Sequence, residues 1–429
     1  MRYIPLNNSI YKRNRLNFMN QMKGNCMAIF NSNDIYPVSA DSELPFAQHR
    51  DMFHLAGIDQ EETILILYPS SKDSKTREIL FIRRSDEHTK IWEGDKLSKD
   101  LASKLSGIES IHFVEDFKNI LHLITSKVDT FYINKNEHYR ANSPVETRED
   151  RFISWLLKKY PAHKVAKSNP ILQRLRSIKH IDEIDQIRKA CQITKKGFNR
   201  VLKFIKPGVW EYQIEAEFIH EFINNSSKGF AYSPIIASGQ DNNVLHYVKN
   251  NKQCKDGELI LMDVGAEYGN YSSDMTRTIP VSGHFSKRQK EIYNTVLRVK
   301  NEATKLLTVG NNWKNFHDQV GEIMTKELLD INLLDKADIK NQTKKNPAYK
   351  KYFMHGTSHH LGLDTHDYGL LEDIFQENMV FTVEPGIYIP EEGFGVRLED
   401  DVVIQTKGEP INLMEDIPIE TDHIEELMN

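Results

Sequence analysis

The chain has 429 residues, of which 39% are hydrophobic and 27% are charged, so it can bury the cores of about two or three globular domains. Its 56 basic and 61 acidic residues give a net charge of −5, which argues against a general nucleic-acid-binding protein. The chain has no apolar run of ~18 residues, no secretory signal and only three well-separated cysteines, a combination typical of a cytoplasmic enzyme without a membrane partner.

Short apolar runs in the first part of the chain predict strands that alternate with helices. Residues 63–68 and 78–82 are typical of buried strands joined by a polar loop, and residues 111–114 and 130–133 predict two further strands. The leucine-rich segment 117–124 predicts a helix. Strands that alternate with helices indicate an α/β domain built in layers.

The character of the sequence changes around Pro170, where basic and polar residues dominate. From Ile181 to Phe204, apolar positions recur at helical spacing, and acidic residues near the start suit the positive end of the helix dipole. Lys206-Pro207-Gly208 then ends this helix. We place the domain boundary near residue 172, which divides the chain into residues 1–172 and 173–429.

The segment 259–280 predicts a hairpin that carries two aspartates. Apolar residues lead into Asp263, a turn follows at residues 268–270, and Asp274 lies on the returning strand. A turn centred on Tyr268-Gly269 places the two aspartates directly opposite each other, with Cβ atoms about 4.5–5.5 Å apart. This prediction depends on the register, because a slip of one residue would turn one aspartate to the other face.

A second hairpin is predicted from residues 381–389 and 394–404, which flank the turn at residues 390–393. The loop centres either on Glu391-Glu392 or one residue later. In both cases Glu384 and Glu399 share one face of the hairpin, directly or diagonally opposed. The two hairpins together therefore offer four carboxylates.

Like charges this close persist in a dry site only when cations or protons compensate them. Between the hairpins, segment 352–369 contains His355, His359, His360 and His366. The segment lacks an HExxH motif, and its glycines favour an irregular loop that aims imidazoles into a site. Four carboxylates near a histidine suit a pair of hard divalent ions of the Mn²⁺ type.

At these residues the sequence resembles the pita-bread metallopeptidases and, among them, aminopeptidase P (Xaa-Pro aminopeptidase). The resemblance implies an α/β creatinase-like N-terminal domain followed by an α+β pita-bread catalytic domain. It spans nearly the whole chain, because residues 31–57 and 91–97 are similar to the family's N-terminal domain and residues 415–428 to its tail. The residues that match the family's five metal ligands are Asp263, Asp274, His359, Glu384 and Glu399.

Related families leave alternatives open. Methionine aminopeptidases share the ligands but usually lack the large N-terminal domain. Prolidases, which are dipeptidases, share both domains but more often have HGxGH where this chain has Ser358 before His359. The fold also serves as a non-catalytic binding module where its ligands are lost, and all five are present here.

The resemblance implies further roles around the ligands. Glu384 would carry a proton from the nucleophile to the leaving nitrogen, and His366 would stabilise the oxyanion. His246 and His355 would line the substrate pocket, whereas His360 matches no family site residue. The candidate catalytic and substrate-binding residues are Glu384, His366, His246, His355, Arg397, Tyr388 and Trp92.

Several of these residues also have plainer structural interpretations. A lone histidine, or an aromatic residue such as Tyr388 or Trp92, is more often a packed core residue. Arg397 could be a cation on a surface strand. However, it lies two residues before Glu399 and on the same strand face, where a guanidinium can hold a ligand carboxylate. The family places the counterpart of Trp92 near a neighbouring subunit's active site.

The resemblance implies hydrolysis of the bond between an N-terminal residue and a following proline. Two divalent ions, with Mn²⁺ favoured, would share Asp274 and Glu399 as bridging ligands. Asp263 would complete one ion site, and His359 and Glu384 the other. The expected partners are peptides with proline in second position and further copies of the chain, as a homo-dimer or homo-tetramer. The N-terminal domain would close one side of the pocket and mediate this self-association.

Overall fold

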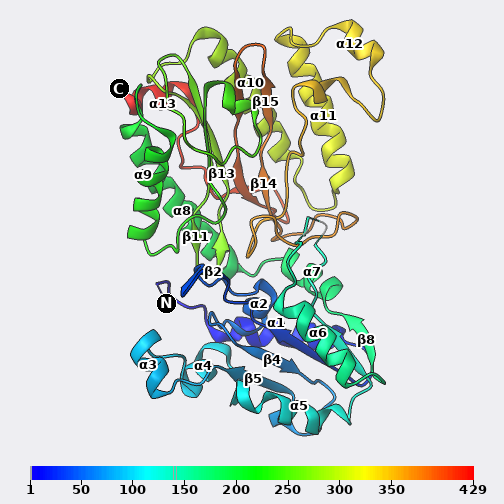
Figure 1. Ribbon diagram of the computed structural model, residues 1–429. Helices are drawn as coiled ribbons and strands as arrows, with labels where there is room; N and C mark the ends of the chain where they lie inside the picture. The colour runs from blue at the N-terminus through cyan, green and yellow to red at the C-terminus, as the bar shows by residue number, and fades with distance from the viewer. Residues whose placement is uncertain (1, 139, 142) are drawn as a thin grey trace. The chain divides into compact units, whose positions relative to one another are not determined.

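In the computed structural model, which describes residues 2–138, 140–141 and 143–429, the chain divides into two units (Figure 1). The N-terminal unit comprises residues 5–176, and the C-terminal unit comprises residues 177–429 together with residues 1–4. The division falls four residues after the boundary that the sequence suggested at residue 172. The reason is that Leu172, on the last helix of the N-terminal unit, packs in the core of that unit.

The N-terminal unit is built on a six-stranded mixed sheet with the strand order β6-β5-β4-β1-β7-β8. Its strands are β1 (Cys26–Asn31), β4 (Ile64–Leu67), β5 (Glu78–Ile82), β6 (Ser110–Phe113), β7 (Thr130–Ile133) and β8 (Lys164–Lys167). The central strand β1 pairs with β4 in antiparallel and with β7 in parallel orientation. A small separate hairpin is formed by β2 (Pro37–Ser39) and β3 (Ser42–Glu43).

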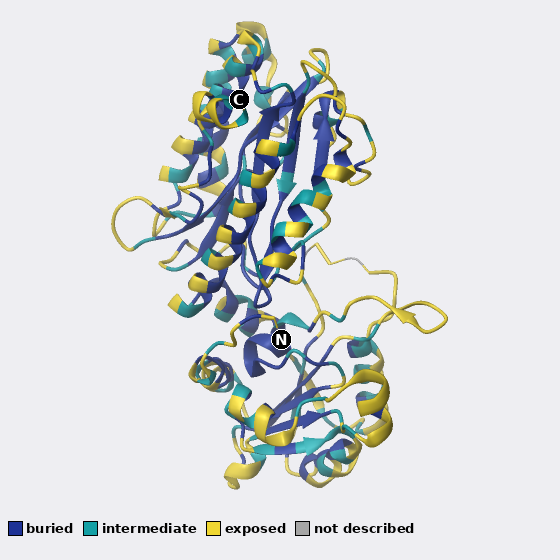
Figure 2. Cartoon of the chain, turned by 90° about the vertical axis from the view of Figure 1, so that its left-hand side faces the viewer, coloured by how far each residue is buried: buried dark blue, intermediate teal, exposed yellow. Residues whose placement is uncertain are grey.

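Helices cover both faces of this sheet because alternate residues of each strand point to opposite sides. On β1, Ala28 and Phe30 join one buried cluster, whereas Met27 and Ile29 join the other. The first cluster is completed by α1 (Asn8–Gln21), α2 (Arg50–Ala56), α4 (Lys99–Ser106) and α7 (Asn169–Ser177), and the second by α5 (Phe117–Thr125) and α6 (Arg148–Lys159). Figure 2 shows these inner faces as buried, whereas α3 (Glu87–Glu93) is largely exposed.

The four strands and the helix predicted for this unit are confirmed, each within one residue at its ends. The prediction missed β1 and β8. The central strand β1 is a short apolar run that periodicity alone does not distinguish from a buried helix segment. The edge strand β8 has a lysine at each end and only two apolar residues, Val165 and Ala166, between them, and it is mostly exposed, so its hydrophobic signal is weak.

The C-terminal unit begins with two packed helices, α8 (Ile181–Phe204) and α9 (Glu211–Asn224). The bounds of α8 coincide with the predicted helix. A three-stranded sheet with the order β13-β10-β9 follows. It consists of β9 (Ile235–Ser238), β10 (Leu259–Val264) and β13 (Met275–Pro280), and the small hairpin of β11 (Glu267–Tyr268) and β12 (Tyr271–Ser272) joins the last two.

The second half of this unit again begins with two long helices, α10 (Lys287–Lys305) and α11 (Trp313–Asp330). The short α12 (Lys336–Asn341) follows them before the strands, and α13 (Thr421–Met428) comes after the strands. The strands are β14 (Val380–Val383), β15 (Gly386–Ile389), β16 (Phe394–Arg397), β17 (Asp400–Val403) and β18 (Ile411–Asn412). A β-bridge between Thr276 and Glu399 joins the strands of the two halves. None of the helices among the described residues combines the length and apolar character that a membrane crossing requires.

Candidate metal centre

The first carboxylate hairpin forms with a register that differs from the predicted one. Its turn centres on Gly269-Asn270, so Asp263 lies opposite Thr276, and Asp274 is its diagonal neighbour. Both turn residues have positive φ, 60° and 70°, which glycine and asparagine tolerate better than other residues. The register differs by two residues rather than one, so the predicted common face of the two aspartates is retained.

The register of the second carboxylate hairpin matches the direct alternative. Gly386 pairs with Arg397, and Val383 pairs with Asp400, which sets Glu384 opposite Glu399. The loop therefore centres on Glu391-Glu392.

One row of side chains crosses both hairpins. Asp263 pairs with Thr276, Thr276 is bridged to Glu399, and Glu399 lies opposite Glu384. Asp274 lies two residues from Thr276 along the same strand and so on the same face. The bridge is supported by the Glu399 N–H, which donates to the Thr276 carbonyl at 3.0 Å, and the Thr276 hydroxyl donates to Glu399 Oε2 at 2.6 Å.

His359 reaches this row from the irregular segment before β14. Its backbone exchanges two hydrogen bonds with Thr382: the His359 N–H donates to Oγ1 at 3.1 Å, and its carbonyl accepts the Thr382 N–H at 3.0 Å. His359 Nδ1 lies 2.9 Å from the His360 carbonyl, to which it donates as the N–H tautomer. Nε2 then faces the carboxylates, 3.4 Å from Asp274 Oδ2 and 3.7 Å from Glu384 Oε1.

Ligand atoms of Asp274, His359 and Glu399 all lie within 4.8 Å of one another, an arrangement that could hold a metal ion. Burial is the main cause that raises the pKa of Asp274 and of Glu399, and it raises the pKa of Glu384 to about 7. Mutual repulsion among the carboxylates adds to these shifts. Raised pKa values show that protein cations compensate these charges incompletely, so the oxygen-rich set suits a hard divalent cation.

Arg397 is the cation that pairs directly with the row. Its Nη2 lies 2.6 Å from Asp263 Oδ2, its Nε donates to Thr276 Oγ1 at 3.2 Å, and its Nη1 donates to the Tyr388 hydroxyl at 3.0 Å. The Tyr388 hydroxyl lies 2.8 Å from His355 Nε2, and His355 Nδ1 lies 2.8 Å from the Gly356 carbonyl. Burial lowers the pKa of His355 to about 3. A neutral His355 that accepts from Tyr388 and donates to Gly356 satisfies this whole chain of bonds.

The remaining histidines named from the sequence differ in how close they lie to the carboxylate row. The His366 ring centroid lies 4.2 Å from that of His359. His246 is exposed, and its electrostatic effect on His355 places it in the same neighbourhood. The ring of His360 packs against Trp313 and Phe381, with centroids 5.5 and 4.5 Å apart.

Trp92 lies on α3 in the N-terminal unit, so the geometry of the metal centre leaves its predicted role as a prediction. Its side chain is 75% exposed, and its ring lies 6.0 Å from that of His88.

Sequence reasoning missed three residues that hold the row in place. Tyr232, in the loop before β9, contacts both aspartates: its hydroxyl oxygen lies 2.6 Å from Asp263 Oδ1 and 2.5 Å from Asp274 Oδ1, and its single proton is donated to one of them at a time. Asp401 accepts the Asp274 N–H at 3.0 Å and the Cys191 thiol at 3.4 Å. Thr276 lies within the predicted hairpin segment 259–280 but was not among the predicted site residues. The common face of the predicted hairpin could have indicated Thr276, whereas Tyr232 and Asp401 act through contacts that strand alternation does not reveal.

A second buried acidic residue lies directly after Glu399. Asp400 Oδ1 pairs with Arg277 Nη2 at 2.6 Å, and its Oδ2 pairs with Lys300 Nζ and accepts from Asn412 at 2.9 Å. Burial acts to raise the pKa of Asp400, but the charges of Arg277 and Lys300 outweigh it and lower that pKa. Arg277 also donates to the Glu399 carbonyl at 2.6 Å and thus holds the backbone of the row.

Comparisons with known proteins agree with this geometry. The model of metallopeptidase family M24 matches residues 185–406, and that of the aminopeptidase P N-terminal domain matches residues 11–132. The chain is 32% identical to the Xaa-Pro aminopeptidase of Escherichia coli (strain K12), and the match covers 97% of each protein.

Two solved structures of E. coli aminopeptidase P are similar to this chain, one Zn-substituted and in complex with product, the other with the inhibitor Pro-Leu. Each has a TM-score of 0.89 and 30% identity, and the match covers 99% of both chains. These structures share the two-domain fold, and the M24 match spans just over half of the sequence. The chain therefore belongs to metallopeptidase family M24, with an aminopeptidase P N-terminal domain ahead of the M24 domain.

Proposed function

We propose that this protein is a two-metal aminopeptidase that hydrolyses the bond between an N-terminal residue and a following proline. The observation that carries this proposal is the row of buried and partly buried carboxylates with His359 at its side. Asp263, Asp274, Glu384 and Glu399 hold up to four negative charges, and Arg397 is their one direct ion pair with a guanidinium or ammonium among the described residues. Two bound divalent cations would neutralise the remaining negative charge of these carboxylates.

The five residues Asp263, Asp274, His359, Glu384 and Glu399 would hold the ions, and the ligand atoms of Asp274, His359 and Glu399 already lie within 4.8 Å of one another. Oxygen donors with a single imidazole favour Mn²⁺ over thiolate-loving metals. When bound, such ions lower the pKa of coordinated water and polarise the substrate carbonyl.

The side chains supply proton transfer and charge stabilisation. Glu384 lies at the edge of the row with 20% of its side chain exposed, so it can accept a proton and deliver it to the leaving nitrogen. His366, whose ring lies beside that of His359, would donate an N–H to the developing oxyanion. Arg397 orients Asp263 and, through Tyr388, fixes the neutral His355.

The substrate assignment is supported by the names of the similar proteins, an Xaa-Pro aminopeptidase and a structure that holds the inhibitor Pro-Leu. His246, His355 and Tyr388 would line the pocket for such a peptide. Exposed Trp92 and Ile91 on α3, at 75% and 78%, support self-association through the N-terminal domain, which would close one side of the pocket in a dimer or tetramer. Three buried free cysteines suit the reducing cytoplasm.

A peptide-length series tests this function. Purified protein is assayed on Xaa-Pro dipeptides, on Xaa-Pro-Yaa tripeptides and on longer peptides, before and after chelation. We expect cleavage of tripeptides and longer peptides that chelation abolishes and Mn²⁺ restores. Cleavage of dipeptides only would establish the prolidase alternative. Full activity after verified metal removal would contradict the metal-dependent mechanism.

Metal analysis per chain separates the enzyme from a non-catalytic scaffold. Two equivalents of divalent metal support the proposed centre, whereas a binding module that has lost its metal function would hold none in stoichiometric amount. Reconstitution with Mn²⁺, Co²⁺ and Zn²⁺ in turn, followed by the peptide assay, ranks the metals.

A further inference from the structure

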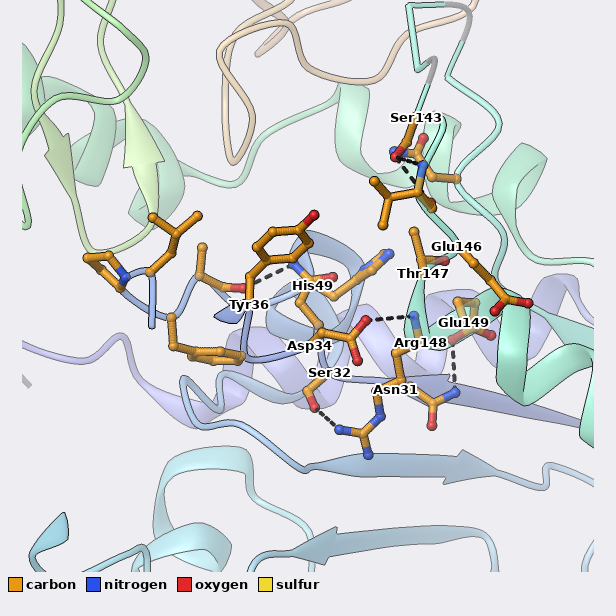
Figure 3. A pocket seen from close by; sticks show the side chains of 17 residues that line it. Asn31, Ser32, Asp34, Tyr36, His49, Ser143, Glu146, Thr147, Arg148 and Glu149 are labelled. Carbon is orange, nitrogen blue, oxygen red and sulfur yellow. Dashed lines mark hydrogen bonds between the residues drawn. The ribbon is translucent and has the colours of Figure 1, made fainter. Parts of the chain in front are cut away.

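The N-terminal unit contains a cavity of about 400 Å³ (Figure 3) that the metal chemistry does not use. We call it the β1–β7 cavity, because its lining includes Asn31 and Ser32 at the carboxyl end of β1 and Asn136 shortly after β7. These two strands are parallel neighbours. The crevice beyond the carboxyl ends of parallel strands is the usual place for ligands in open α/β sheets, and this volume fits a small molecule.

The first turn of α6 brings a buried carboxyl group to this cavity. Glu149 is only 7% exposed. Its Oε2 accepts a hydrogen bond from Asn31 Nδ2 at 2.8 Å, whereas its Oε1 is fully buried and has no hydrogen-bond partner among the described residues. A buried acceptor without a donor is costly, so Glu149 gains a hydrogen bond when its carboxyl group turns toward a donating ligand in the cavity. Burial raises the pKa of Glu149 to about 7, although the hydrogen bond from Asn31 and the charge of Arg148 act to lower it.

The neighbouring residue offers the opposite chemistry. The Arg148 guanidinium is half-buried and donates from Nη1 to Ser32 Oγ at 3.1 Å (Figure 3). Among the described residues, no carboxylate oxygen lies within 4 Å of it. Asp34 does not neutralise it, because its Oδ2 accepts the Arg148 backbone N–H at 2.9 Å and its Oδ1 pairs with Arg151. The guanidinium therefore has free donors for a carboxylate.

Apolar side chains complete the lining: Tyr36, Leu44, Phe46 and Val145. A ligand that satisfies all three features carries an ammonium group, a carboxylate and an apolar body. We propose that the β1–β7 cavity binds a small zwitterion, an apolar amino acid or short peptide, with its ammonium on Glu149 and its carboxylate on Arg148. This site lies wholly within the N-terminal unit, and the proposal does not depend on the reaction proposed for the metal centre.

Calorimetric titration of the full-length protein tests this site, with L-leucine as the probe. L-Leucinamide lacks the carboxylate and N-acetyl-L-leucine lacks the ammonium, so each should bind the parent protein at least about tenfold more weakly than leucine. In Arg148→Met, leucine and leucinamide should bind with equal affinity, because the partner of the carboxylate is gone. In Glu149→Gln, leucine and N-acetyl-leucine should likewise become equal. Leu-Leu, titrated in parallel, distinguishes an amino-acid site from a peptide site by which ligand binds more tightly.

Glu146→Gln is the matched control, because Glu146 also lines the cavity but is exposed. We expect it to bind leucine as the parent protein does. All variants should cleave Xaa-Pro peptides at the parent rate, which shows that they fold and that the metal centre is not the site of the effect. Leucine and Leu-Leu that bind Arg148→Met and Glu149→Gln as tightly as the parent, or that fail to bind the parent at millimolar concentration, would overturn the proposal.

Discussion

Glu399 and Asp400 are consecutive buried acids with opposite electrostatic surroundings. Glu399 faces three other carboxylates, and burial together with the charge of Asp274 raises its pKa. Asp400 faces Arg277 and Lys300, whose charges overcome the effect of burial and lower its pKa. Successive residues of an extended chain point to opposite faces, which allows one segment to serve both environments.

The difference shows how this protein builds a cation site. The Asp400 side is neutralised by protein cations and holds the strands together without any added ion. The Glu399 side has an excess of carboxylates and is complete only when cations bind. Predictions that disturb one side and spare the other therefore test whether the two acids have separate roles.

The largest effect is expected on the Glu399 side, for His359→Ala. This change removes the imidazole whose Nε2 faces Asp274 and Glu384. We expect the variant to lose about one equivalent of metal per chain. Its activity should fall by more than about 100-fold, which is the upper end of the loss seen when a residue that only supports a ligand is removed. Metal analysis by mass spectrometry and the peptide assay measure both.

Two neighbouring histidines are the controls. His360→Ala should keep its metal and most of its activity, because its ring packs among Trp313 and Phe381 rather than among the carboxylates. His366→Ala should keep both metals while kcat falls, since the proposed role concerns only the transition state. A metal site emptied in His360→Ala but filled in His359→Ala would show that the ligand assignment is off by one residue.

On the Asp400 side, we expect Arg277→Met to lower stability rather than metal stoichiometry. The change leaves a fully buried carboxylate with one cation instead of two and removes the bond to the Glu399 carbonyl. Breaking a buried ion pair by deleting one partner costs about 3–5 kcal/mol. Chemical denaturation of the metal-loaded protein checks this value. An unchanged unfolding midpoint, or a selective loss of metal from a fully stable protein, would remove the distinction between the two sides.

Much of the row could be predicted from the sequence because strand alternation has a period of two. Asp263 and Asp274 were expected to be direct partners but are diagonal neighbours, and their common face survived because the register error was an even number of residues. For Glu384 and Glu399 both possible turn centres preserved the face, and the structure has the direct pairing.

The supporting contacts could not be predicted in the same way. Tyr232 reaches Asp263 and Asp274 from a loop, and Lys300 reaches Asp400 from helix α10, about a hundred residues away in sequence. Such contacts depend on how helices and loops pack onto the sheet, which local periodicity does not encode. The strand β1 was missed for a related reason, since its identity comes from pairing on both sides.

In the metal-free protein, the pH dependence of folding stability should distinguish the Glu399 side from the Asp400 side. Burial raises the pKa of Glu384 to about 7, above the ordinary value of 4.5. The folded state therefore binds this proton more tightly than the unfolded state, and stability is lost as the pH rises through about 7. Glu384→Gln cannot ionise, so after chelation it should be about 1–3 kcal/mol more stable than the parent at pH 8.

At pH 5 the parent and Glu384→Gln should be nearly equal, because Glu384 is then protonated in the folded chain. The folded state lowers the pKa of Asp400, so the ionised Asp400 stabilises the fold at every pH above the ordinary pKa of an aspartate. This stabilisation is lost only when the pH falls towards the lowered pKa. Thermal unfolding of both chelated proteins across this range measures the difference. A gap that is constant with pH would contradict the raised pKa of Glu384.

The smallest effect should come from Thr276→Val. This change removes a hydroxyl group between the two hairpins and leaves every proposed metal ligand in place. Thr276 Oγ1 donates to Glu399 Oε2 at 2.6 Å and accepts from Arg397 Nε at 3.2 Å, so it fixes a carboxylate and its guanidinium neighbour together. Valine has nearly the same shape but cannot donate, and groups that orient a ligand typically contribute 10–100-fold to metal affinity. We expect about a tenfold loss, measured by competition with a chelator, because every proposed ligand remains. Thr276→Ser keeps the hydroxyl and should restore the affinity. A loss in Thr276→Ser together with full affinity in Thr276→Val would assign the effect to packing of the methyl group instead of to the hydrogen bond that orients Glu399.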